Sequence, residues 1–267
     1  MSWMSLSAVL TIGGSDSCGG AGIQADIKAI NNFSVHGCTA ITCVTSQNTL
    51  GVSKIEPLSY GSIKSQIDSV LSDININIIK TGMLYNTEII KLVSTTLTNF
   101  SKLKVIDPVM VSRAGSRLIT DDAIETYKNL IFPQATLLTP NIFEASLLSG
   151  INIINKDDVI ISAKEIMAFG PKSVLIKGGG LNSLAGCDYY LDCENRQKWF
   201  QRKSIKTLNT HGSGCTLSAA IAACLANGNN LMTSIELAKD YMQLCLQNGI
   251  NIGSGTGIVN QFKDVLA

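Results

Sequence analysis

Short runs of β-branched and other apolar residues alternate along this chain with segments that have the hydrophobic spacing of helices. The runs are residues 8–12, 41–44, 78–79, 105–106, 137–138 and 174–176, and each ends at a polar or glycine-rich turn. Such alternation is typical of βαβ units, in which helices connect buried parallel strands. The sequence therefore predicts an α/β fold with a mostly parallel sheet and helices on both faces.

The segments between the runs and after them complete this prediction. Apolar residues recur at helical spacing in residues 23–30, 63–70 and 89–97, which indicates helices that pack on the sheet. Residues 188–191 and 198–201 alternate as antiparallel edge strands do. No linker, composition break or internal repeat marks a boundary. We expect residues 1–267 to form a single domain.

The composition favours a compact protein that binds a small molecule. Of the 267 residues, 45% are hydrophobic and 15% are charged, which supports a large core rather than disorder. The 21 basic and 20 acidic residues form no long run of one sign, so no patch for nucleic acid or an anionic membrane is visible. No apolar stretch has the length of a membrane span, and residues 1–6 show no basic residue ahead of a hydrophobic run. We expect a cytoplasmic location.

The cysteines show no pattern of a zinc site. They are Cys18, Cys38, Cys43, Cys187, Cys193, Cys215, Cys224 and Cys245. None belongs to a Cys-x-x-Cys pair, and only His36 and His211 could add imidazole ligands. We expect most thiols to be reduced and several to fill core space as small apolar groups.

Polar and glycine residues follow each predicted parallel strand directly. These segments are residues 13–16, 46–48, 80–83, 107–109, 139–141 and 177–180. In open parallel sheets, ligands bind beyond the carboxyl ends of the strands. The sequence therefore predicts one ligand site at that edge.

The segment of residues 209–216, Asn-Thr-His-Gly-Ser-Gly-Cys-Thr, gives the strongest local signal. Gly212 and Gly214 allow a tight turn immediately before a helix-forming stretch, which leaves amides exposed at a helix N-terminus. Such an anion hole suits phosphoryl transfer, whose transition state spreads charge over the phosphoryl oxygens. Ser213 and Cys215 lie within it. Because a helix N-terminus lowers the pKa of a thiol, Cys215 could accept the proton of an attacking hydroxyl. A cysteine packed at a helix start by chance is the alternative.

Residues 13–22 form a second glycine-rich turn, between the first strand and a helix that carries Asp26. Neither the P-loop pattern nor the dinucleotide fingerprint occurs in the chain. These two common nucleotide-binding folds are therefore excluded, although such a turn alone is weak evidence for a ligand.

Further charged and amide side chains follow the later strands. Asn141 and Glu144 lie one helical turn apart, so Glu144 could orient Mg²⁺ through water together with Asp107. The same spacing also fits a capping box. If only these two residues are considered, the capping box is favoured over the Mg²⁺ site. Lys177 precedes three glycines and could meet a phosphate as a point charge. Lys239 could meet the same anion, although a helical lysine is usually solvated.

Together these motifs resemble the ribokinase-like kinases and, more closely, the hydroxymethylpyrimidine/phosphomethylpyrimidine kinases of thiamin biosynthesis. The resemblance covers nearly the whole chain and is carried in order by residues 10–16, 19–26, 47–49, 80–84, 107–110, 139–144, 177–179 and 209–216. It implies a three-layer α/β/α kinase fold with a small antiparallel edge. It also implies ATP and Mg²⁺ as cofactors, a pyrimidine alcohol and then its monophosphate as acceptors, and a homodimer.

The resemblance also implies roles for single residues. Its implied residues are Cys215 as the base, with Gly212, Ser213 and Gly214 in the anion hole; Lys177, Asn141, Thr210 and Lys239 for the phosphates; Asp107 and Glu144 for Mg²⁺; and Gln47, Asp26, Gly14, Met83 and Val109 for the acceptor. A side-chain amide such as Gln47 can pair the donor and acceptor edges of an aminopyrimidine.

Two departures and two alternatives accompany this interpretation. Cys18 stands where the resembled family usually has a small hydroxyl residue, and Gly13 where alanine is common, which bears on fine specificity. A pyridoxal or pyridoxine kinase of the same branch is the alternative enzyme, and Gln47 favours the pyrimidine by analogy. A sensor without catalysis is the other alternative, but it would not need an anion hole for a transition state.

Overall fold

The structure is a computed structural model, and it describes residues 6–111, 118–120 and 122–262. Its strands are β1 (Ala8–Asp16), β2 (His36–Asn48), β3 (Gly51–Pro57), β4 (Ile78–Thr81), β5 (Leu103–Ile106), β6 (Leu137–Leu138), β7 (Ser173–Lys177), β8 (Cys187–Asp192) and β9 (Gln197–Gln201). Its helices are α1 (Gly22–Asn32), α2 (Tyr60–Asp73), α3 (Thr87–Asn99), α4 (Ala123–Leu130), α5 (Ile142–Ser149), α6 (Lys156–Met167), α7 (Ser213–Ala226) and α8 (Leu231–Gln247). Short 3₁₀ turns are Phe132–Gln134, Gly178–Gly180 and Asn182–Leu184.

The described strands form one nine-stranded sheet in the order β3-β2-β1-β4-β5-β6-β7-β8-β9. The six central strands, in the sheet order β2-β1-β4-β5-β6-β7, pair in parallel. β3 at one edge, and β8 and β9 at the other, are antiparallel. The chain runs outward from β1 through β2 and β3, and then returns to the other side of β1 with β4. The strand order therefore reverses beside β1, where open α/β sheets place their ligands.

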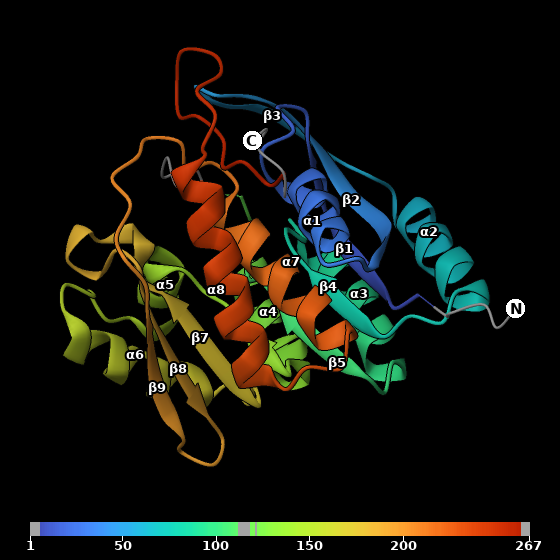
Figure 1. Cartoon of the computed structure of the whole chain (residues 1–267). Coiled ribbons are helices and arrows are strands. Elements are labelled where there is room, and N and C mark those ends of the chain that lie inside the picture. The colour runs from blue at the N-terminus through green and yellow to red at the C-terminus, as the bar shows by residue number, and fades with distance from the viewer. Residues whose placement is uncertain (1–5, 112–117, 121, 263–267) are drawn as a thin grey trace, which may run out of the picture.

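Helices cover both faces of the sheet (Figure 1). One hydrophobic core joins the sheet to α2, α3, α4, α5 and α6, and a second joins its other face to α1, α7 and α8. Alternate side chains of one strand enter different cores: in β1, Leu10 and Ile12 face the first core and Val9 faces the second. Burial on both faces explains why the parallel strands are continuous apolar runs. The predicted α/β fold with helices on both faces is confirmed.

The hairpin of β2 and β3 differs from the sequence prediction. Residues 46–48 were expected to follow a strand that ends at residue 44, but β2 continues to Asn48 and pairs with β3. Most residues of β3 are exposed or only half-buried, so it lacks the apolar run that marks a buried strand. The hairpin brings Gln47 to the sheet edge as part of a strand instead of a turn.

The eight cysteines are unpaired, and Cys38, Cys43, Cys187, Cys224 and Cys245 are buried. Within the described part of the chain, no helix is long and apolar enough to cross a membrane. The prediction about the N-terminal segment concerns mainly residues 1–5, which lie outside the described residues. The prediction of one domain stays a prediction.

Candidate active site

A cavity of about 1010 Å³ opens beyond the carboxyl ends of the parallel strands. All of the residues that the sequence singled out contribute to its lining: Gly14, Asp26, Gln47, Met83, Asp107, Val109, Asn141, Glu144, Lys177, Thr210, Gly212, Ser213, Gly214, Cys215 and Lys239. They come from strand ends and the loops that follow them, from α1, α5 and α8, and from the start of α7. The structure thus brings the predicted positions together, while their roles stay predictions.

The loop before α7 has the form that an anion hole requires. Gly212 is the N-cap of α7 and has φ +82°, and a Cβ atom there would lie 1.7 Å from the carbonyl oxygen of Gly20. The Ser213 N–H donates to the carbonyl oxygen of Thr210. The N–H groups of Gly214 and Cys215 have no acceptor among the described residues. These two amides are therefore available to an anion at the helix N-terminus.

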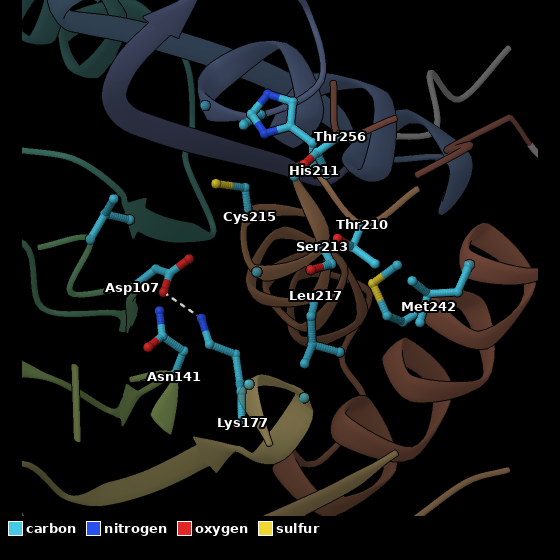
Figure 2. A pocket seen from close by; sticks show the side chains of 18 of the residues that line it. Asp107, Asn141, Lys177, Thr210, His211, Ser213, Cys215, Leu217, Met242 and Thr256 are labelled. Atoms are coloured by element: carbon cyan, nitrogen blue, oxygen red, sulfur yellow. Dashed lines mark hydrogen bonds and ion pairs between the residues drawn. The ribbon is translucent and has the colours of Figure 1, made fainter. Parts of the chain in front are cut away.

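The side chain of Cys215 faces the cavity from the first turn of α7 (Figure 2). Burial raises the pKa of this thiol to about 12, although the charge of Lys80 acts in the opposite direction. The expectation that the helix N-terminus lowers this pKa is therefore wrong. The cost of burying a thiolate, together with the nearby charges of Asp26 and Asp107, exceeds the stabilisation by the helix dipole.

A buried ion pair lies next to Cys215. The Lys80 ammonium of β4 is 2.8 Å from both carboxylate oxygens of Asp26 on α1, and the Thr11 hydroxyl donates to Asp26 at 2.5 Å. Both members of the pair are almost fully inaccessible to solvent. From the sequence, Lys80 is visible only as part of a turn after a strand, because nothing in the local sequence indicates its partner on α1. Asp26 is therefore held in place by Lys80 before any acceptor binds.

The carboxylates of Asp107, directly after β5, and of Glu144, on α5, line the same cavity as Lys177 at the end of β7. The Lys177 ammonium donates to Asp107 at 2.7 Å. This cation is therefore already paired with a carboxylate in the structure. Burial raises the pKa of Asp107, but Lys177 and Lys80 outweigh burial and hold it below its usual value. A Cβ atom on Gly214 would lie 3.3 Å from the Lys177 ammonium. The cation of this pair therefore also faces the anion hole.

The capping box predicted from the spacing of Asn141 and Glu144 is present. The side chain of Asn141 accepts from the Glu144 N–H, and the Glu144 carboxylate accepts from the Asn141 N–H and, with its other oxygen, from the Met110 N–H. Burial raises the pKa of Glu144 to about 7. Carboxylate oxygens are the ligands that Mg²⁺ prefers, and a cation near Glu144 would replace its proton. The donor set of Asp107 and Glu144 therefore fits Mg²⁺ held through water.

The raised pKa of Glu144 predicts a pH dependence of stability. Unfolded glutamate titrates near 4.5 and the folded group near 7, so the folded chain binds more protons in this window. The free energy of unfolding should fall as the pH rises through it. In Glu144→Gln, which keeps an acceptor for the Asn141 N–H but not for the Met110 N–H, urea denaturation should show this fall reduced by about 1–3 kcal/mol. Identical pH profiles in both proteins would contradict the prediction.

Lys239 on α8 and Thr210 before α7 also line the cavity. Lys239 is buried, and its ammonium is 2.5 Å from the carboxylate of Asp188 and 3.2 Å from the carbonyl oxygen of Gly186. The general expectation of a solvated helical lysine does not hold here, because α8 packs against the sheet edge. The side chain of Thr210 lies beside Ser213 (Figure 2).

The candidate acceptor end is apolar at its base. Met83 packs with Cys43 and Leu118, and Val109 packs against this group. A Cβ atom on Gly14 would lie 3.0 Å from the Cys43 sulfur, so only glycine leaves this surface open. The main chain of Gln47, which also lines the cavity, is held by a hydrogen bond from its N–H to the Ser17 hydroxyl at 2.8 Å.

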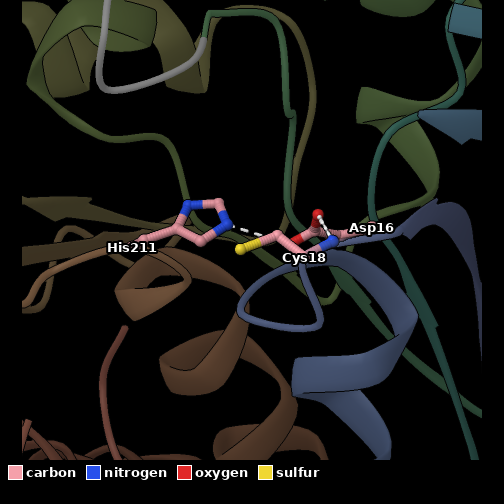
Figure 3. Close-up of side chains that lie close together, drawn as sticks. All are labelled: Asp16, Cys18 and His211. Atoms are coloured by element: carbon pink, nitrogen blue, oxygen red, sulfur yellow. Dashed lines mark hydrogen bonds and ion pairs between the residues drawn. The ribbon is translucent and has the colours of Figure 1, made fainter. Parts of the chain in front are cut away.

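Sequence reasoning missed the contact between Asp16 and His211, which lie 2.8 Å apart (Figure 3). Both residues lie inside the quoted motifs, but 195 positions separate them, so no local signal reveals the contact. With Cys18 they form a group whose possible ligand atoms lie within 4.8 Å of one another. The Asp16 carboxylate already accepts from the N–H groups of Cys18, Gly20 and Ala21. Hydrogen bonds from these three N–H groups and from His211 thus already occupy the Asp16 carboxylate.

Comparison with known proteins gives consistent matches. The model of the family described as phosphomethylpyrimidine kinase matches residues 16–260. A hydroxymethylpyrimidine/phosphomethylpyrimidine kinase of Synechococcus elongatus is 44% identical over 97% of this chain and 98% of its own length. Among solved structures, a pyridoxal kinase of Bacillus subtilis in complex with ADP has a TM-score of 0.88 at 34% identity, over 96% of this chain and 98% of that one. A phosphomethylpyrimidine kinase of Clostridium difficile has a TM-score of 0.77 at 38% identity, over 88% and 99% of the two chains.

Proposed function

The chain belongs to the phosphomethylpyrimidine kinase family, and on this premise we propose that it uses ATP to phosphorylate 4-amino-5-hydroxymethyl-2-methylpyrimidine. The monophosphate is then the acceptor of a second phosphoryl group, in the biosynthesis of thiamin. A homodimer, which the family resemblance implies, and a cytoplasmic location, which the sequence leads us to expect, are part of the proposal.

The observation that carries the proposal is the convergence of an anion hole, a thiol and an amide-bearing hairpin on one cavity. The free amides of Gly214 and Cys215 and the ammonium of Lys177 provide positive charge at one point. Met83 and Gln47 provide an apolar base and a hydrogen-bonding edge for a flat polar ring at another. A phosphate donor and a ring alcohol can therefore meet beside Cys215.

The residues divide the work of phosphoryl transfer. Gln47 and Met83 hold the ring so that its hydroxymethyl group points to Cys215, whose thiolate form accepts the hydroxyl proton as the oxygen attacks. Lys80 is the resident cation that favours the thiolate of Cys215, against the effect of burial. The amides of Gly214 and Cys215 and the ammonium of Lys177 stabilise the charge of the transferred group. Mg²⁺, held through water by Asp107 and Glu144, would neutralise phosphate charge.

We expect Gln47→Met to weaken use of the pyrimidine more than use of ATP. Methionine has similar length but cannot pair the ring edge, so KM for the pyrimidine should rise by about tenfold while KM for ATP stays within about twofold. Steady-state kinetics with each substrate varied in turn measure both values. Ser46→Ala, at the exposed neighbouring position of the same strand and outside the cavity lining, is the control. An equal rise in both KM values would place Gln47 outside the acceptor pocket.

The pyridoxal kinase of Bacillus subtilis, with its TM-score of 0.88, supports a second candidate acceptor. Pyridoxal also has a hydroxymethyl group on a flat ring. It lacks the amino group next to a ring nitrogen that a side-chain amide can pair at two points. The amide of Gln47 therefore favours the pyrimidine.

A further inference from the structure

His211 lies where three segments around the acceptor end of the cavity meet. Its Nε2 atom is 2.8 Å from Oδ2 of Asp16 at the end of β1 (Figure 3) and 3.4 Å from Nε2 of Gln47 in the β2–β3 hairpin. A Cβ atom on Gly20 would lie 2.4 Å from the imidazole, so the ring also packs on the glycine-rich turn. His211 therefore connects the anion-hole loop to both segments of the acceptor pocket.

The carboxylate of Asp16 determines where the imidazole carries its proton. Burial raises the pKa of Asp16, but its hydrogen bonds with His211 and with the Ala21 and Cys18 N–H groups hold it below its usual value. The carboxylate is thus ionised and can only accept hydrogen bonds. Nε2 of His211 must carry a proton in this contact, whether the ring is neutral or charged.

This proton conflicts with the amide nitrogen of Gln47, because both groups would then be donors that face each other. A half-turn of the amide places Oε1 towards His211, where it shares the Nε2 proton that is donated mainly to Asp16. The same half-turn places Nε2 towards the Thr45 hydroxyl, which lies 3.2 Å from the amide oxygen and 3.1 Å from the carbonyl oxygen of Ser15. The single proton of Thr45 is then donated to Ser15, and the Thr45 oxygen accepts from the Gln47 amide.

We propose that His211 is a positioning residue that holds the Gln47 amide with Oε1 towards His211 and Nε2 towards Thr45, and so sets which ring edge the cavity accepts. The inference rests on the proposed function in placing the acceptor ring against Gln47. The main chain of Gln47 is already fixed, since Ser17 donates to its carbonyl oxygen at 2.9 Å and accepts from its N–H at 2.8 Å. The orientation of the Gln47 side-chain amide therefore decides which ring edge it can pair with.

An amide held in one orientation distinguishes two classes of ring. It pairs with a ring nitrogen acceptor next to an amino donor, as in a 4-aminopyrimidine. It opposes the exchanged pattern of a 4-oxopyrimidine, whose ring N–H faces a donor and whose carbonyl faces an acceptor. Unpaired polar groups of this kind weaken binding strongly. His211 thereby determines specificity without contacting the ring.

The first test determines which imidazole nitrogen of His211 carries the proton, and it needs no substrate. The chain has two histidines, His36 and His211, so His36→Gln leaves one imidazole, whose ¹⁵N NMR signals are assigned at once. At about pH 8, where a histidine is usually neutral, we expect the proton on Nε2. A proton on Nδ1 with a bare Nε2 would overturn the proposal.

The second test compares two variants of similar size. His211→Gln keeps an N–H donor, whereas His211→Met removes it. We expect His211→Met to lose about tenfold of the preference for 4-aminopyrimidine over 4-oxopyrimidine acceptors, with KM for ATP unchanged, and His211→Gln to keep most of this preference. A purely structural role would reduce kcat for both acceptors equally.

Two outcomes separate the possible failures. An unchanged preference in His211→Met, or an equal loss in both variants, would overturn the positioning role. If the wild-type protein phosphorylates neither pyrimidine, the proposed function fails, and the NMR measurement still decides where the His211 proton lies.

Discussion

Cys215→Ala is expected to lose turnover by about 10²–10⁴-fold while keeping the melting profile. The thiol lies beside the free amides at the start of α7, and no other described thiol lines the cavity. Removing it deletes the proton acceptor but leaves Lys80 paired with Asp26. Single-turnover ATP consumption with saturating pyrimidine measures the chemical step, and calorimetry measures the melting temperature.

Cys224→Ala is the matched control for this variant. Cys224 lies on the same helix, is buried and does not line the cavity. We expect it to lower the melting temperature slightly and to keep turnover, which is the opposite pattern. Near-wild-type activity of Cys215→Ala would remove Cys215 as the base.

Lys80→Met is expected to destabilise the fold by about 3–5 kcal/mol. The substitution leaves the Asp26 carboxylate buried without its cation. Burial lowers the pKa of Lys80, but Asp26, Cys215 and Asp107 outweigh it and hold the pKa above its usual value, so the ammonium is charged in the folded state. Urea denaturation at neutral pH measures the free energy of unfolding.

The exposed pair of Lys64 and Asp68 on α2 provides the comparison for Lys80→Met. Lys64→Met should change the free energy of unfolding by less than about 0.5 kcal/mol, because solvent screens an exposed i,i+4 pair. The double variant Asp26→Asn with Lys80→Met should regain part of the loss, since no charge is then buried alone. A loss for Lys80→Met as small as that for Lys64→Met would show that the buried pair does not stabilise the fold.

The part of the fold predicted from the sequence depends on local patterns. Most parallel strands are buried on both faces as continuous apolar runs, and the half-buried β2 contains the run of residues 41–44, so all six parallel strands were recognised. β3 was missed because none of its residues is buried at the sheet edge, so it has no apolar run. The capping box of Asn141 and Glu144 was readable because its partners are three residues apart.

The contacts within the site could not be read in the same way. Asp26 meets Lys80 across 54 positions, and Asp16 meets His211 across 195. Such pairs depend on which strands become neighbours in the sheet, and no local pattern specifies them. The pKa of Cys215 was predicted in the wrong direction for a related reason: helix position is visible in the sequence, whereas the depth of burial depends on the complete fold.

The most direct test of the central claim is ATP consumption by the purified protein with Mg²⁺, measured in parallel with hydroxymethylpyrimidine, pyridoxal and no acceptor. We predict strong turnover with the pyrimidine that continues to a second phosphate per acceptor, little with pyridoxal, and almost none without acceptor. Preference for pyridoxal, or no turnover with any acceptor, would contradict the proposed function.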